Sequence, residues 1–212
     1  GGVRLRLCLL RRGLARRQLR EHGMRGHHRD VAVGGGHAID AGVRGGVILI
    51  IDLVVSKVKG SAPRALRIVS ALAALGLTFV MANAYFMSVA IPAWASWQTF
   101  PLFVLGNLAM GVALLALFES DLAKSGTYLI AAAVLSVLAV VAIALEAVHF
   151  AGIGEDMTLL AIGAVIVAAA AALQLMAKLG KVAPKTAALV AFACVFVGVA
   201  LARYGFYVAY AL

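Results

Sequence analysis

Four polar residues stand inside otherwise apolar runs of the sequence: Asn83, Glu146, His149 and Arg203. Glu146 and His149 are separated by two residues, a spacing that places both side chains on one face of a helix. A carboxylate and an imidazole can accept the two protons that leave a hydroquinone when it is oxidised. We therefore take the four residues as candidate site residues, and a quinol site, in which they would be the quinol-binding residues, is one interpretation of them.

Arg203 requires a partner if its helix lies in lipid. An unpaired charge within a membrane span costs at least about 2.5–3.5 kcal/mol. Glu146 is the carboxylate at a comparable depth, so we predict an ion pair between Glu146 and Arg203, with His149 beside it. Three interpretations are open at this point: an ion pair that locks two helices together, a quinol site, or the substrate or proton path of a transporter.

Five apolar runs carry these residues. The chain has 212 residues, of which 64% are hydrophobic and 13% charged, and its mean hydropathy is +1.02. Soluble domains are about 45–50% apolar, and a helix needs about 20 residues to cross the hydrocarbon core of a bilayer. The sequence predicts an all-α, polytopic transmembrane helix bundle with spans at about 65–90, 99–118, 127–150, 157–178 and 185–210.

The charges of the loops predict the orientation, because cytoplasmic loops collect lysine and arginine. Loops 91–98 and 151–156 contain neither residue. The other flanks carry Lys57, Lys59, Arg64, Arg67, Lys124, Lys178, Lys181 and Lys185. We expect a multi-pass protein whose C-terminus lies outside.

Depth along the helices predicts a polar layer near the outer face. At 1.5 Å per residue, five polar side chains fall within about 12 Å of the outer surface. They are Asn83, Asn107, Glu146, His149 and Arg203. Gln174 falls in the inner half instead. Trp94, Trp97 and the tyrosines near the end of the last span are expected at the outer interface, where amphipathic rings prefer to lie.

The first part of the chain has a different character. Residues 1–45 are rich in Arg, Gly and His without helical periodicity, and we expect this leader to be disordered or not native. Its basic charge is not taken as a sign of a nucleic-acid partner. We assign residues 46–212 to the transmembrane bundle, in which an apolar stub at 46–55 is too short to span.

Other chemistries have little support in the sequence. Glu146-x-x-His149 matches one half of a di-iron bundle motif, but that site needs a second such motif and further glutamates. No nucleotide-binding, zinc or hydrolase motif is present. We assign no catalytic residue and expect no bound metal or haem.

Two stretches carry a resemblance to a known family. The first, at 83–111, includes Tyr85, a Pro92-x-Trp94 turn, Phe100-Pro101-Leu102 and Leu105-Gly106; the second includes Arg203, Tyr204, Phe206 and Tyr207. In order and spacing these residues resemble the membrane anchor subunit of dimethyl sulfoxide reductases. The resemblance covers the C-terminal five helices.

The resemblance implies an eight-helix bundle with both termini outside, in which the five runs are the fourth to eighth helices. It implies a bacterial cytoplasmic membrane protein that anchors a molybdopterin catalytic subunit and an iron–sulfur subunit. Such a subunit oxidises menaquinol as its substrate and acts only within the complex. Glu146 and His149 rest on the depth argument rather than on the resemblance. The alternative function is a small-solute membrane transporter fragment.

Overall fold

The computed structural model describes residues 47, 51, 54–55 and 64–209. Five long helices make up most of the described chain, and each is long and apolar enough to cross a membrane. This confirms the predicted all-α, polytopic bundle. The long helices are α2 (Arg64–Phe86), α3 (Thr99–Phe118), α5 (Gly126–Ile153), α6 (Thr158–Lys178) and α7 (Pro184–Val208), and the short α4 is Ser120–Lys124.

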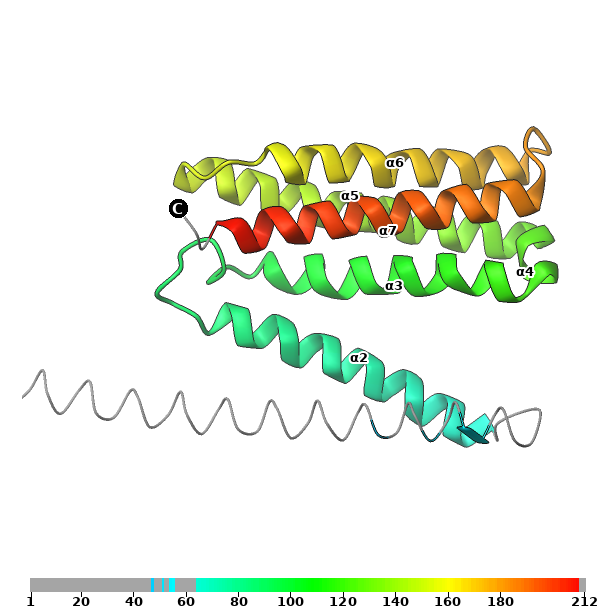
Figure 1. The fold of residues 1–212 in the computed structure, drawn as a ribbon, viewed down its shortest axis with the longest axis horizontal. Helices are drawn as coiled ribbons and strands as arrows, with labels where there is room; N and C mark the ends of the chain where they lie inside the picture. Colours follow the sequence, from blue (N-terminus) through cyan, green and yellow to red (C-terminus); the bar gives the residue numbers. More distant parts are fainter. Residues whose placement is uncertain (1–46, 48–50, 52–53, 56–63, 210–212) are drawn as a thin grey trace, which may run out of the picture.

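Consecutive long helices run antiparallel, so their connections gather at two ends of the bundle (Figure 1). One end holds the α2–α3 loop, the α5–α6 loop and the end of α7; we call it the aromatic end. The other holds α4 and the α6–α7 turn, with the exposed Lys124, Lys178, Lys181 and Lys185; we call it the lysine end. Helix α2 diverges from α3 towards the lysine end.

Glycine ends two of the spans. Gly154 after α5 has φ 82° and Gly180 after α6 has φ 71°, a left-handed conformation that glycine adopts without a Cβ penalty. The next amide then donates back over the last turn, from Glu155 to the Phe150 carbonyl at 2.9 Å and from Lys181 to the Met176 carbonyl at 2.9 Å. Both spans therefore end in the hydrogen-bonded glycine motif common at helix C-termini.

Two helix ends and one connection differ from the predictions. Helix α2 ends at Phe86 rather than near residue 90, and turns follow it up to Gln98. Pro92 disfavours a helical conformation for the residue before it, which limits the extent of the helix. Helix α5 continues to Ile153 because its stop signal is Gly154. The α3–α5 connection contains the short helix α4, which the hydropathy pattern did not reveal.

Helices α6 and α7 approach each other most closely. A Cβ on Gly163 would lie 2.5 Å from the Gly198 carbonyl oxygen, and one on Gly198 would lie 2.7 Å from the Gly163 carbonyl oxygen. Glycine at both positions permits this backbone contact, as is common where membrane helices associate. The pair forms the frame against which α3 and α5 pack.

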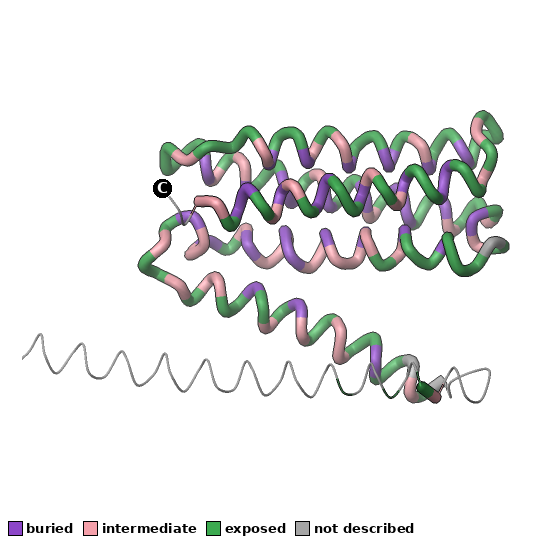
Figure 2. The backbone as a smooth tube through the Cα atoms, in the orientation of Figure 1, coloured by how far each residue is buried: buried purple, intermediate pink, exposed green. Residues whose placement is uncertain are grey.

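The outward faces of the helices are exposed (Figure 2) and carry many large apolar side chains. Val148, Val165 and Phe118 are 71%, 71% and 78% exposed, as expected for side chains that face lipid tails. Of the predicted stub at 46–55, only Val47, Ile51, Val54 and Val55 are described, all as helical residues. The predicted leader at 1–45 lies outside the described residues, so the predicted domain division stays a prediction.

Candidate functional site

Six aromatic side chains from α2, α3, α5, α7 and the α2–α3 loop form a cluster at the aromatic end. Phe206 lies at its centre, with ring centroids 5.6 Å from Phe103 and 6.4 Å from Phe150. These separations fall in the range of favourable ring contacts. We call Tyr85, Trp94, Phe103, Phe150, Phe206 and Tyr207 the aromatic cluster.

Trp94 fixes the α2–α3 loop over this cluster. Its indole Nε1 donates to the Phe206 carbonyl at 2.8 Å, and the Thr99 hydroxyl donates to the Trp94 carbonyl at 3.0 Å. The Trp94 and Phe206 rings stack with centroids 5.9 Å apart. Residues far apart in sequence are thereby joined at one level of the bundle.

Glu146 belongs to the buried stripe of α5. The stripe repeats every three or four residues through Ala139, Ile143, Glu146 and Phe150, the spacing of a helix face that packs against neighbours. Glu146 is 0% exposed, and neither carboxyl oxygen has a hydrogen-bond partner among the described residues. Burying an ionised, unpaired carboxylate costs several kcal/mol, so this group requires either a proton or a donor from a ligand.

His149 lies one turn further along α5 and is half-buried. Its Nε2 is 3.1 Å from the Pro92 carbonyl oxygen in the α2–α3 loop. A carbonyl can only accept, so Nε2 carries a proton in this contact. The neutral tautomer then leaves Nδ1 free of hydrogen and able to accept a proton.

Arg203 is held by α3. Its Nη2 donates to Asn107 Oδ1 at 2.6 Å and to the Phe103 carbonyl at 3.4 Å. The guanidinium carbon lies 4.8 Å from the centre of the Phe103 ring, a distance at which the ring face attracts a cation. Nε of the same side chain is buried and has no partner in the described part of the chain.

The Asn107 amide extends this contact to α2. Its Nδ2 donates to the Thr78 hydroxyl at 2.9 Å, and that hydroxyl donates to the Ala74 carbonyl at 3.0 Å. One chain of hydrogen bonds thus links α7, α3 and α2 within the apolar layer. Such links between spans typically contribute about 0.6 kcal/mol each.

The predicted ion pair between Glu146 and Arg203 is wrong. Within residues 64–209 the structure forms no such pair, and Arg203 bonds to Asn107 and Phe103 of α3 instead. Depth along a helix gives the level of a side chain but not its direction around the axis. Phe103 and Asn107 lie one turn apart on the face of α3 that meets Arg203, so they reach the guanidinium first.

Asn83 does not join these residues. It is exposed on α2, and its side chain makes no hydrogen bond with the described residues. The sequence predicted the level of Asn107 in the bundle correctly. It predicted no hydrogen-bond partner for Asn107 and no role for Thr78. Both residues could have been found from their polarity within apolar runs, because buried polar side chains in a membrane tend to hydrogen-bond to one another.

Near the lysine end, two hydrogen bonds join neighbouring spans. Ser136 Oγ donates to Gln174 Oε1 at 3.1 Å, joining α5 to α6. The Tyr128 hydroxyl donates to the Val112 carbonyl, joining α5 to α3. Among the described residues, no group of three or more His, Cys, Asp and Glu side chains could hold a metal ion.

The fold and the site define a class: an all-α, multi-pass membrane protein with a polar and aromatic layer near one end of its bundle. No family model, curated protein or solved structure matches the chain. The resemblance to reductase anchor subunits therefore stays a prediction, and the geometry of the aromatic end carries the functional argument.

Proposed function

We propose that this chain is the membrane anchor subunit of a molybdoenzyme respiratory reductase, similar to that of dimethyl sulfoxide reductase, and that its aromatic end oxidises menaquinol. The observation that carries the proposal is Glu146, fully buried with both carboxyl oxygens unpartnered among the described residues. A bundle gains no stability from such a group. Retaining it at this cost is typical of a functional site.

The chemistry of quinol oxidation suits the neighbouring groups. Menaquinol loses two electrons and two protons as it becomes menaquinone. Glu146 and Nδ1 of His149 are one turn apart on α5 and supply two proton acceptors. The protons then pass to water at the aromatic end, and both electrons pass to the iron–sulfur partner subunit.

Arg203 contributes a positive charge at the same end. Both of its hydrogen bonds are to α3, while its buried Nε has no partner within residues 64–209. A free donor of this kind can bind a quinol oxygen. Phe103, which packs under the guanidinium, belongs with Phe150 and Phe206 to the aromatic cluster, which can contact the flat ring of a naphthoquinol.

The proposed orientation places the aromatic end outside a bacterial cytoplasmic membrane. The four exposed lysines of the described part lie at the opposite end, as the positive-inside rule requires. The iron–sulfur subunit would dock at the aromatic end and hold the molybdopterin subunit beyond it. In this proposal the lipid bilayer is the other partner, and nucleic acid is none.

The test is binding of a fluorescent naphthoquinol analogue to the full chain in lipid nanodiscs. Glu146→Gln removes the proton acceptor while keeping shape, and we expect the affinity to fall about tenfold or more, since a hydrogen bond to a charged group contributes about 1.5–3 kcal/mol. Glu155→Gln, at the same end but in the α5–α6 loop, is the matched control and should bind like the unaltered chain. Equal affinity of the Glu146→Gln variant contradicts the proposal.

Three further measurements separate the alternatives. Gel filtration of the Glu146→Gln variant shows whether the bundle still assembles, and loss of assembly favours a purely structural role. Flux of protons or a small solute across vesicles that depends on Glu146, without analogue binding, favours a transporter. Co-purification of an iron–sulfur protein with the chain supports the anchor function.

A further inference from the structure

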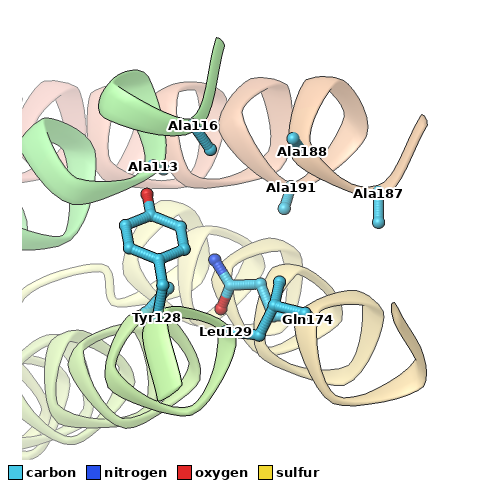
Figure 3. A pocket seen from close by; sticks show the side chains of 9 residues that line it. Ala113, Ala116, Tyr128, Leu129, Gln174, Ala187, Ala188 and Ala191 are labelled. Carbon is cyan, nitrogen blue, oxygen red and sulfur yellow. The ribbon is translucent and has the colours of Figure 1, made fainter. Parts of the chain in front are cut away.

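A small hollow lies near the lysine end, between α3, α5, α6 and α7 (Figure 3). Its volume of about 10 Å³ is close to what one water molecule requires. Alanines form most of its wall, and their short side chains leave the space open. The lining residues are Ala113, Ala116, Tyr128, Leu129, Ala132, Gln174, Ala187, Ala188 and Ala191.

Gln174 is the buried polar group of this hollow, with only 4% of its surface exposed. Its Oε1 accepts from Ser136, while its Nε2 makes no hydrogen bond within the described part of the chain. Figure 3 shows that nitrogen turned towards the alanines of α3 and α7. Because Ser136 can donate or accept, either orientation of the amide leaves one polar atom facing the hollow.

Tyr128 supplies a second polar atom. Its hydroxyl hydrogen is donated to the Val112 carbonyl, so the oxygen keeps a lone pair that can accept a hydrogen bond. The ring lines the same hollow as Gln174. An amide donor and a phenol acceptor are complementary to one molecule that both accepts and donates.

We propose that this hollow binds one ordered water molecule, which accepts from Gln174 Nε2 and donates to Tyr128 Oη. Leaving the amide nitrogen without a partner in an apolar interior costs about 1–3 kcal/mol, and a bound water removes that cost. A buried water needs at least about two polar partners, which these side chains provide.

The consequence is a polar junction between spans. Ser136 and Tyr128 belong to α5 and Gln174 to α6, while Val112 belongs to α3. The water closes the gap between the Ser136–Gln174 pair and the Tyr128–Val112 pair. The junction lies far along the spans from Glu146 and does not depend on the proposed quinol chemistry.

A crystal structure of the full chain in a lipidic phase, at a resolution that shows waters, is the direct test. We expect a density peak within hydrogen-bond distance of Gln174 Nε2 and Tyr128 Oη. The Gln174→Leu variant should lack that peak. An empty hollow in the unaltered chain overturns the proposal.

Filling the hollow gives a second test, in which the sign of the change in Tm distinguishes a bound water from an empty cavity. Filling an empty cavity with a methyl group stabilises a protein, whereas displacing a needed water destabilises it. We expect Ala188→Val to lower Tm by about 2–4 °C, relative to the control Ala193→Val on the exposed face of α7. In a Gln174→Leu background the same change should no longer lower Tm. A rise in Tm for Ala188→Val alone contradicts the proposal.

Discussion

At the lysine end the buried Gln174 amide accepts a hydrogen bond from Ser136 at 3.1 Å, whereas at the aromatic end the fully buried Glu146 carboxyl accepts none from the described residues. Both side chains lie within spans of similar apolar character. The pairing of Gln174 stabilises the contact between α5 and α6. An unpaired buried carboxyl destabilises the bundle instead, as expected if Glu146 belongs to the proposed ligand site.

Arg203 combines the features of the hydrogen-bonded Gln174 and the unpartnered Glu146. Its Nη2 is paired with α3, yet its Nε is buried without a partner among the described residues. The side chain therefore both fastens α7 to α3 and presents a donor. Its two roles can be separated experimentally because they use different nitrogens.

The close contact between α6 and α7 forms the frame for both ends of the bundle. Disrupting this contact should have the largest effect of the substitutions considered. Gly198→Leu would drive a side chain into the Gly163 carbonyl and Val167, which lie 2.7 and 2.6 Å from an added Cβ. We expect destabilisation of about 3 kcal/mol or more, seen as aggregation in gel filtration and a much lower Tm.

Gly111→Leu is the matched control for this substitution. Gly111 is exposed on α3, and an added Cβ there meets no atom within 4 Å. We expect this variant to remain monodisperse. Equal behaviour of the two variants would show that the α6–α7 contact does not frame the bundle.

The arrangement of spans was predictable from the sequence, because apolar length alone determines where a helix can cross a membrane. The predicted span 99–118 coincides with α3. Ends set by local backbone conformation were less accurate, as at Gly154, where a left-handed residue rather than polarity stops α5. Short polar helices such as α4 leave no hydropathy signal.

The pairing of polar side chains was not predictable to the same degree. The sequence placed Glu146, Asn107 and Arg203 in one outer layer, but the structure joins only Asn107 to Arg203. Which groups meet depends on the rotation of each helix about its axis and on its neighbours, since α3 contacts both α5 and α7. Neither quantity follows from spacing along one chain segment.

A smaller effect is expected from the hydrogen bonds of Asn107. Asn107→Leu removes the acceptor of Arg203 Nη2 and the donor to Thr78. We expect a loss of about 1.5–3 kcal/mol, measured by thermal unfolding in nanodiscs. Thr78→Val breaks only the neutral link and should cost less. A smaller loss for Asn107→Leu than for Thr78→Val would mean that Arg203 does not depend on α3.

The smallest effect concerns the exposed α5–α6 loop at the aromatic end. Asp156 Oδ1 accepts from the Thr158 amide at 2.8 Å and from its hydroxyl at 2.6 Å. The side-chain hydrogen bond from Thr158, followed by the one from its backbone, lowers the pKa of Asp156. A lowered pKa in the folded state contributes stability above the unfolded value and loses it as the pH falls below about 4.

Asp156→Asn tests this contribution. The unaltered chain should show a small decrease in Tm between about pH 5 and 2 that the variant lacks, after both curves are referred to pH 5. Parallel curves would show that the hydrogen bonds between Asp156 and Thr158 make no pH-dependent contribution to stability.

The contrast between the two ends is tested most directly by thermal unfolding of Glu146→Leu and Gln174→Leu side by side in the same nanodiscs. Replacing an unpartnered buried carboxyl by a similar apolar side chain should leave Tm unchanged or raise it. Replacing the paired Gln174 should lower Tm by about 2–4 °C, the equivalent of roughly 1 kcal/mol. Opposite signs, or a loss confined to Gln174→Leu, are the predicted result. A loss of Tm in Glu146→Leu as large as that in Gln174→Leu would show that Glu146 holds the bundle together and would contradict the proposed site.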